Sequence, residues 1–142
     1  MFYLRQIEEG DAKIIFEWQS NPITRQYFFD PTIPSYDEHH TWVRDRVTHH
    51  FNTTFIIIDE EEASGIVRLD TYDNKNNSYI ISILIDPVKY RKGLAEKALM
   101  EICEKYKTSE LYARVKIKNL PSRQLFKKCG FINVESDLYL KK

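Results

Sequence analysis

The sequence is short of the residues that staple small proteins or interrupt regular structure. Among its 142 residues it has only two cysteines, four glycines and five prolines. The cysteines, Cys103 and Cys129, are too few for a disulfide framework and lack the close spacing of metal-ligand pairs. We therefore expect a reduced protein that folds around a hydrophobic core and binds no metal.

Long apolar runs and an excess of charge of one sign are also missing. No apolar stretch reaches the roughly 18 residues of a membrane span, and the N-terminus lacks the apolar segment of a signal peptide. The 21 basic residues balance 21 acidic ones, so no overall field would recruit nucleic acid or an anionic membrane. We expect a cytoplasmic protein that binds neither, and in which any anion site is local.

What the sequence does contain is typical of a globular domain. Apolar residues make up 42% and aromatic residues 13%, and a chain of this length can bury a core without covalent staples. No repeat or low-complexity tract divides the chain. We expect a single domain over residues 1–142.

The most informative stretch covers residues 79–106. Residues 80–85 are almost all apolar and rich in β-branched side chains, which predicts a buried central strand. Pro87 ends this strand, and from Leu94 onward apolar residues recur at helical spacing. The basic loop 89–93 therefore leads into a helix N-terminus, where unpaired N–H groups and the helix dipole favour an anion such as phosphate.

Periodicity and turn residues divide the rest of the chain into further elements. Strands are predicted at 2–7, 53–59, 65–72, 111–117 and 131–140, helices at 12–18, from Ser35 onward, 94–106 and 119–128, a charged turn at 60–64, and an irregular loop at 23–36. This order predicts an α/β (α+β) fold, with a mixed, mostly antiparallel sheet of about six to seven strands and about four helices. The helix 94–106 should join two parallel strands.

Two motifs in this order resemble the GCN5-related N-acetyltransferase (GNAT) superfamily, and the resemblance covers the chain from end to end. The family's loop [QR]-x-x-G-x-[GA] is matched by Tyr90-Arg91-Lys92-Gly93-Leu94-Ala95, with Tyr90 in place of the usual Gln or Arg. The family's N-x-x-S-x-x-L-F-x-x-x-G-F is matched at Asn119, Ser122, Leu125, Phe126, Gly130 and Phe131.

The resemblance implies acetyl-CoA as the cosubstrate, without a metal. The backbone of residues 90–95 would hold its pyrophosphate, and the backbone near Ile83 and Ile85 would pair with pantetheine between splayed parallel strands. Asn119, Ser122 and Phe126 would lie on the helix beside the thioester.

The N-terminal half resembles the branch that acetylates the 4-amino group of nucleotide-linked amino sugars, as in pseudaminic acid biosynthesis. The similar residues are Trp18, Asn21, Arg25, the group Glu38-His39-x-x-Trp42 and the strand motif 65–70. This branch grades into the N-terminal acetyltransferases of ribosomal proteins. We therefore expect acetyl transfer to a UDP-linked amino sugar, with a protein N-terminus and a non-catalytic acyl-CoA-binding module as alternatives.

The acid that protonates the leaving thiolate is not the usual one. Many members of the family use a Tyr in the position that Phe126 occupies here, and phenylalanine cannot donate a proton. Ser122 is our replacement candidate, with Tyr139 and unprotonated departure of the thiolate as alternatives. A serine in the first turn of a helix also has a purely structural explanation.

The base that accepts the proton of the amine is also open. The glutamate often found on the family's fourth strand is replaced by Ile80. The amine would lose its proton to water, or to His39 assisted by Glu38, because a histidine titrates in the required range.

Three further residues are candidates for binding the acceptor. Arg25 and Arg68 suit a substrate phosphate, and Trp42 suits stacking on a sugar or a base. The structural alternatives are ion pairs with Asp30 and Asp70 for the two arginines, and core packing for the tryptophan. We expect a monomer, or a homodimer formed through the edge of the last strand.

Overall fold

The computed structural model describes residues 1–142. The strands are β1 (Phe2–Gln6), β2 (Thr54–Asp59), β3 (Glu62–Thr71), β4 (Ser78–Ile85), β5 (Glu110–Arg114), β6 (Phe131–Glu135) and β7 (Leu138–Lys141). The helices are α1 (Ala12–Ser20), α2 (Pro22–Arg25), α3 (Tyr36–His49), α4 (Leu94–Lys105) and α5 (Leu120–Lys128), with short 3₁₀ segments η1 (Glu9–Asp11), η2 (Phe51–Thr53) and η3 (Pro87–Lys89).

The strands form one seven-stranded mixed sheet in the order β1-β2-β3-β4-β5-β7-β6. The predicted α/β class is confirmed, and β4 runs parallel to β5 as expected. The chain packs as two compact units. One comprises Met1–Arg68 with Ile83–Leu94, and the other comprises Leu69–Ser82 with Ala95–Lys142.

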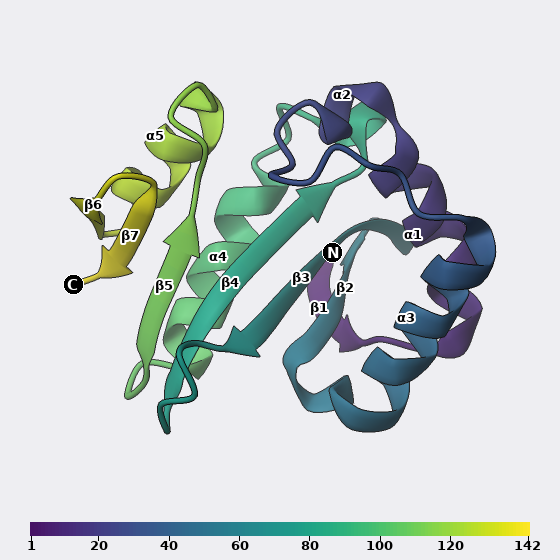
Figure 1. The fold of residues 1–142 in the computed structure, drawn as a ribbon, viewed down its shortest axis with the longest axis horizontal. Coiled ribbons are helices and arrows are strands. Elements are labelled where there is room, and N and C mark those ends of the chain that lie inside the picture. The colour runs from purple at the N-terminus through teal and green to yellow at the C-terminus, as the bar shows by residue number, and fades with distance from the viewer. The chain divides into compact units, whose positions relative to one another are not determined.

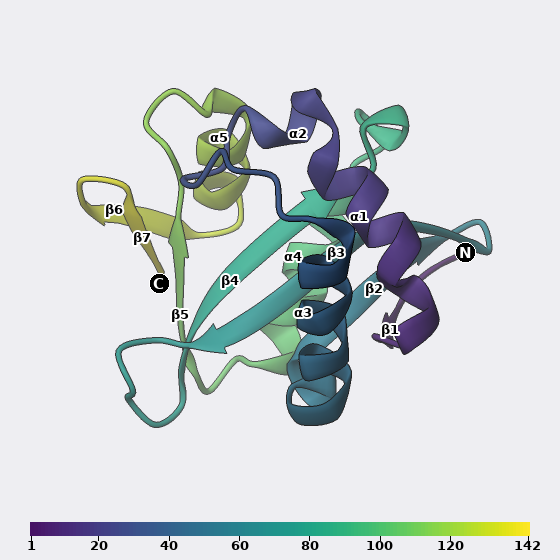
Figure 2. The same cartoon turned by 45° about the vertical axis from the view of Figure 1, so that its right-hand side comes forward.

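The first unit is built around β2. This strand pairs antiparallel with β1 on one side and β3 on the other, and every residue of β2 except its last is buried. Helices α1 and α3 lie side by side in this unit (Figure 2). Their apolar faces and the strands share a core of Ile7, Ala12, Ile15, Trp18, Val43, Ile56, Ile58 and Ile66.

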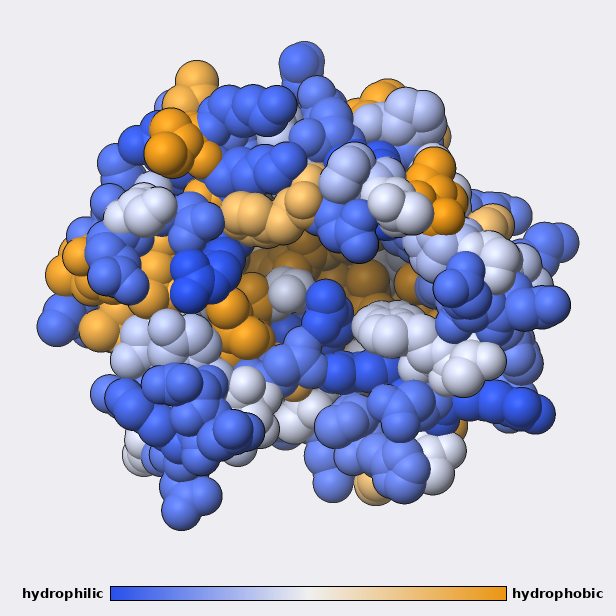
Figure 3. All heavy atoms as spheres, in the orientation of Figure 1, coloured by the Kyte–Doolittle hydropathy of each residue, from blue (hydrophilic) through white to orange (hydrophobic).

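The second unit packs α4 and α5 with the C-terminal strands. Ala98, Leu99 and Ile102 of α4 are fully buried, as the predicted apolar stripe requires. Helix α5 lies beside the β6–β7 hairpin (Figure 1), where the Phe126 and Phe131 rings meet edge to face at 5.0 Å. Apolar side chains reach the surface over this hairpin (Figure 3), and those of β6 include Ile132 and Val134.

Two helices begin at residues that cap them with their side chains. The Ser35 side chain accepts the N–H of Glu38, whose carboxylate accepts the N–H of Ser35, so a capping box begins α3. Asn119 caps α5 by accepting the N–H of Ser122 at 3.3 Å. Short-range side-chain chemistry therefore decided where these helices begin.

Three predicted elements differ in kind from the structure, and the predicted strand 111–117 ends earlier, at Arg114. The loop 23–36 includes the end of a short helix, α2, because Asn21 caps a helix in which Pro22 is tolerated at the start. The charged turn is only Glu60-Glu61, both with positive φ, and β3 already begins at Glu62. The single strand predicted at 131–140 is instead a hairpin of two strands, β6 and β7. The chain turns at Ser136, which has a φ of 41°.

Gly65 on β3 marks a close backbone approach in the first unit. A Cβ at this position would lie 2.6 Å from the carbonyl oxygen of Leu84 and 3.0 Å from the Cδ1 atom of Ile85. Because the nearest atom belongs to the backbone of β4, it cannot rotate away as a flexible side chain would. Glycine is therefore required here by space.

We expect Gly65→Ala to lower the free energy of unfolding by about 2 kcal/mol, because the added methyl group overpacks the β3–β4 contact. Urea denaturation measures this change. Gly10→Ala is the matched control, since a Cβ at Gly10 would meet no atom within 4 Å. Equal stability of the two variants would contradict the close approach.

Candidate functional site

The predicted anion loop leads from β4 into α4. Arg91 has a φ of 70° and Gly93 a φ of 72°, and residues 91–93 are exposed. No acceptor in the protein takes the N–H groups of Arg91, Lys92 or Gly93. Successive unpaired N–H groups at the start of a twelve-residue helix form a site suited to a phosphate.

The start of this loop is anchored to β3 by the backbone N–H of Asp86, whose side chain caps η3. Its N–H donates to the carbonyl of Ser64 at 2.9 Å, and its carboxylate accepts the N–H of Val88 at 3.1 Å. Lys89 adds a 2.6 Å ion pair with Glu62 and a 3.3 Å hydrogen bond to the hydroxyl of Ser64. The ion pair lowers the pKa of the Glu62 carboxyl, and it fixes the loop before Tyr90.

Tyr90, the departure from the family pattern, ends the 3₁₀ segment η3 with its N–H on the carbonyl of Pro87. Its phenol is near Tyr27, and desolvation, followed by the charges of Tyr27 and Asp86, raises the pKa of Tyr90. The sequence contains no indication that Tyr27 acts on Tyr90, because Tyr27 lies 63 positions earlier in the chain.

Strand β4 contributes both predicted isoleucines. Ile85 is buried and Ile83 is half-buried. The parallel ladder between β4 and β5 runs only from Ser78↔Glu110 to Ile80↔Tyr112. On its opposite edge, from Tyr112 to Arg114, β5 pairs antiparallel with β7.

Three predicted residues lie together on α5 in the second unit. Asn119 caps the helix, Ser122 follows in the first turn, and Phe126 is buried one turn later. Ser122 is half-buried, and its hydroxyl makes no hydrogen bond within the protein. An uncommitted hydroxyl is able to donate a proton to a ligand, which a phenylalanine at position 126 is not.

Tyr139, the alternative acid, is 2% exposed on β7. Its hydroxyl oxygen accepts a hydrogen bond from Nε of Arg123 at 3.1 Å, and the same guanidinium donates to the carbonyl of Ile117 at 3.0 Å. This network ties α5 to β7 and to the loop before the helix.

His39 is buried between α1 and α3, with 4% of its surface exposed. Its Nε2 atom lies 2.9 Å from the carbonyl oxygen of Ala12, so Nε2 carries the proton and donates it. Burial lowers the pKa of His39, although the hydrogen bond with the Ala12 carbonyl acts in the opposite direction. The helical pattern of α3 alone suggests that His39 lies on the surface. Its burial depends on α1, whose position is set by tertiary packing and cannot be read from that pattern.

Trp42 contacts two other residues that were predicted to act on or bind the acceptor, His39 and Arg68. The His39 ring stacks on it at 5.9 Å, and the Arg68 guanidinium lies 5.6 Å from its ring centre. Trp42 also packs against the hydrophobic core. Glu38 is exposed and serves the capping box, and its hydrogen bonds to Ser35 lower the pKa of its carboxyl.

Arg25 ends α2 and turns back on its own segment. Its guanidinium donates to Gln19, Asp30, Pro31 and Thr32, and it stacks over the Phe28 ring at 4.4 Å. The predicted partner Asp30 is engaged through its backbone carbonyl, while its carboxylate accepts the N–H of Thr32. The bonds to Thr32 lower the pKa of Asp30, with a smaller effect from the nearby guanidinium.

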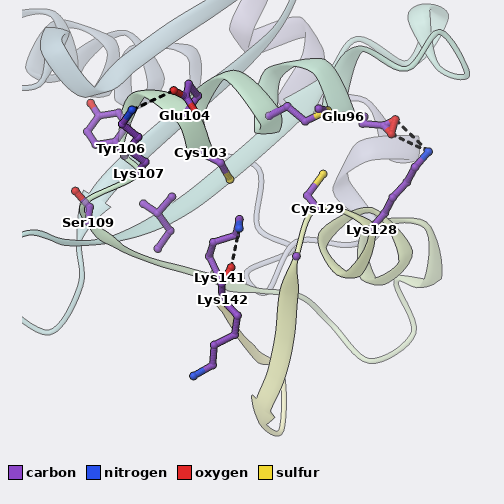
Figure 4. Close-up of a pocket in the computed structure, with 13 residues that line it drawn as sticks. Glu96, Cys103, Glu104, Tyr106, Lys107, Ser109, Lys128, Cys129, Lys141 and Lys142 are labelled. Atoms are coloured by element: carbon purple, nitrogen blue, oxygen red, sulfur yellow. Dashed lines mark hydrogen bonds and ion pairs between the residues drawn. The ribbon is translucent and has the colours of Figure 1, made fainter.

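A cavity of about 750 Å³ opens in the second unit, and none of the predicted site residues lines it. Cys103 and Cys129 point into it from α4 and from the end of α5 (Figure 4). Burial raises the pKa of both thiols, so both are protonated near neutral pH. This pocket lacks the chemistry of the predicted site.

The arrangement of metal-ligating side chains and the character of the helices bear on the class of site. Nowhere do three or more His, Cys, Asp or Glu side chains gather in a way that would hold a metal ion. None of the helices combines the length and the apolar character needed to cross a membrane.

The buried His39 predicts a pH dependence of stability. Because its pKa is lowered on folding, the unfolded state binds the proton more tightly, so the stability that His39 contributes is full above the unfolded pKa near 6.5 and falls as the pH drops. At pH 7.5 we expect His39→Phe to cost about 1 kcal/mol by removing the hydrogen bond that Nε2–H donates to the Ala12 carbonyl.

This difference between wild type and His39→Phe should shrink between pH 7.5 and pH 5, as measured by urea denaturation. The exposed His49→Gln is the control and should track the wild type. A difference that stays constant with pH would mean that His39 does not titrate on unfolding.

Comparison with known proteins places these features in a family. The family model described as "acetyltransferase (GNAT) domain" matches residues 2–132. No curated protein sequence gives a match.

Solved structures share the fold at low sequence identity. A GNAT-family acetyltransferase from Bacillus anthracis has a TM-score of 0.80 and 18% identity, over 98% of this chain and 92% of that one. Spermidine N-acetyltransferase from Vibrio cholerae, in complex with CoA and spermine, has a TM-score of 0.81 and 22% identity, over 99% and 92%. RimL, a ribosomal L7/L12 α-N-protein acetyltransferase in complex with CoA, has a TM-score of 0.81 and 14% identity, over 99% and 93%.

The likeness to these structures is one of fold, and the family match covers most of the chain. The protein therefore belongs to the GNAT family and is an acetyltransferase that uses acetyl-CoA.

Proposed function

We propose that the protein acetylates a primary amine by direct attack of the neutral amine on the thioester. The observation that carries this proposal is the run of exposed, unpaired N–H groups at Arg91, Lys92 and Gly93 before α4. They suit the pyrophosphate of acetyl-CoA, and the side chains of Arg91 and Lys92 add positive charge. Bound acetyl-CoA supplies the thioester carbonyl that the amine attacks.

Ser122 is the residue that we propose as the proton donor to the leaving thiolate. Its hydroxyl is half-buried and has no partner in the protein, whereas the Tyr139 hydroxyl is buried and bonded to Arg123. Asn119 holds the first turn of α5 and thereby orients Ser122.

For the proton of the amine, the geometry favours water as the acceptor. His39 is buried, and its Nε2–H is committed to the Ala12 carbonyl. Glu38 is committed to the capping box. A role for this pair in catalysis would require both residues to leave those bonds.

The acceptor predicted from the sequence is the 4-amino group of a UDP-linked amino sugar, and two observations favour an amine without phosphate. The guanidinium of Arg25 is used inside its own segment. Residues 26–38 contain Asp30, Asp37 and Glu38 but no Lys or Arg, which favours a cationic acceptor over a diphosphate. We therefore propose a peptide N-terminus or a polyamine as the acceptor class.

Similar structures make both acceptor classes reasonable starting points. The Vibrio cholerae protein is named for spermidine, and RimL is named for the N-terminus of a ribosomal protein. The non-catalytic alternative, an acyl-CoA-binding module, rests on the absence of a tyrosine at position 126 and a glutamate at position 80.

Thiol release from acetyl-CoA tests the function directly. We expect release with spermine or with N-terminal peptides, and at least tenfold less with UDP-linked 4-amino sugars at equal concentration. Greater release with the sugars would restore the acceptor predicted from the sequence. Release with none of them, together with tight CoA binding, would support the binding module instead.

Ser122→Ala should lower kcat by about 100-fold or more, because general acid catalysis typically contributes about 10²- to 10⁴-fold. The affinity for acetyl-CoA, measured by calorimetry, should change less than twofold. Ser109→Ala, which removes a hydroxyl bonded to Asn77 in the same unit, is the matched control and should retain turnover. Unchanged turnover in Ser122→Ala would remove Ser122 from the mechanism.

A further inference from the structure

The guanidinium of Arg25 is satisfied entirely within residues 19–32. Nη1 donates to the carbonyl of Gln19 at 3.3 Å and to its side-chain oxygen at 2.6 Å. Nη2 donates to the carbonyls of Asp30, at 3.1 Å, and Thr32. Nε donates to the carbonyl of Pro31 at 3.4 Å. All five N–H groups of the side chain therefore have acceptors.

These bonds hold residues 30–32, whose backbone makes no regular pairing of its own, whereas residues 26–28 still donate to backbone carbonyls of α2. The segment after α2 has no helix or strand before α3, yet three successive carbonyls, 30 to 32, converge on one side chain. The Phe28 ring lies against the guanidinium at 4.4 Å. A planar fork with divergent donors can hold such a turn, and a lysine ammonium cannot.

The side chain also ties this turn to a rigid base. Gln19, its partner on α1, is 7% exposed. Thr24 adds hydrogen bonds to the carbonyls of Trp18, at 2.6 Å, and Asn21, at 2.9 Å. The position of the turn is therefore set by the buried end of α1.

What the turn presents is suited to a ligand. Phe29 is 54% exposed and Ile33 49% exposed, and the charge of Tyr27 acts on the phenol of Tyr90. Aromatic and apolar side chains thus stand exposed on a segment that belongs to the same unit as the cofactor loop.

We propose that Arg25 is a positioning residue that fixes the turn 26–32 in the form that receives the acceptor amine. This inference rests on the proposed function for the identity of the acceptor. It assigns Arg25 a part in specificity without contact to a substrate phosphate, because a phosphate would have to displace hydrogen bonds that already satisfy every N–H group. The acceptor is then recognised by the side chains that the turn displays.

Arg25→Lys tests the inference, because it retains the charge and removes the fork. We expect the KM for the best amine of the thiol-release panel to rise at least tenfold, with the KM for acetyl-CoA within twofold and kcat within threefold. Arg44→Lys, at an exposed arginine of α3 paired with Glu9, is the matched control and should leave all three constants unchanged.

Hydrogen exchange supplies a measurement that does not need activity. Arg25→Lys should speed amide exchange in residues 26–32 at least tenfold and leave exchange in β2 unchanged. Equal exchange in the variant and the wild type would overturn the proposal even if no amine is acetylated, whereas faster exchange without activity towards any amine would count against the proposed function alone.

A phosphate-binding role would give a different result. Inorganic pyrophosphate would then compete with the amine in the wild type, and this competition would disappear in Arg25→Lys. That outcome would overturn the positioning role. The absence of such competition, with the acceptor KM raised, would support it.

Discussion

The close approach of β3 and β4 at Gly65 is the constraint on which the loop 89–93 depends. The carbonyl of Leu84 occupies the space that a side chain at position 65 would take, and the carbonyl of Ser64, the residue before Gly65 on β3, receives the N–H of Asp86. Asp86 in turn caps η3. The direction in which the chain enters the loop 89–93 is therefore set by a backbone contact, before any charged side chain acts.

Much of this loop was predictable because it depends on local chemistry. Unpaired N–H groups arise wherever a helix begins, so the loop before Leu94 could be recognised without knowing its surroundings. The capping residues Ser35 and Asn119 could be identified for the same reason. The family motif on α5 added Ser122, since its spacing from Asn119 is itself a helical turn.

The acceptor half was less predictable because its determinants are tertiary. Asn21-Pro22 marks both the end of α1 and the start of α2. The sequence pattern indicates only that α1 ends there. Arg25 binds backbone carbonyls, which every residue has, so its partners leave no signature in the sequence. His39 is buried because α1 covers it, and helical periodicity alone cannot report the position of another helix.

The two-residue turn at Glu60-Glu61 has a consequence for how this sequence tolerates change. Both residues have positive φ, a conformation that hairpins normally give to Asn-Gly and that costs other residues about 1 kcal/mol each. The hairpin is therefore locally frustrated, and its register is imposed by the burial of β2. Replacing Glu60-Glu61 with Asn-Gly would relieve this frustration. The turn is therefore a position at which the protein can be made more thermostable without changing a residue proposed to take part in catalysis.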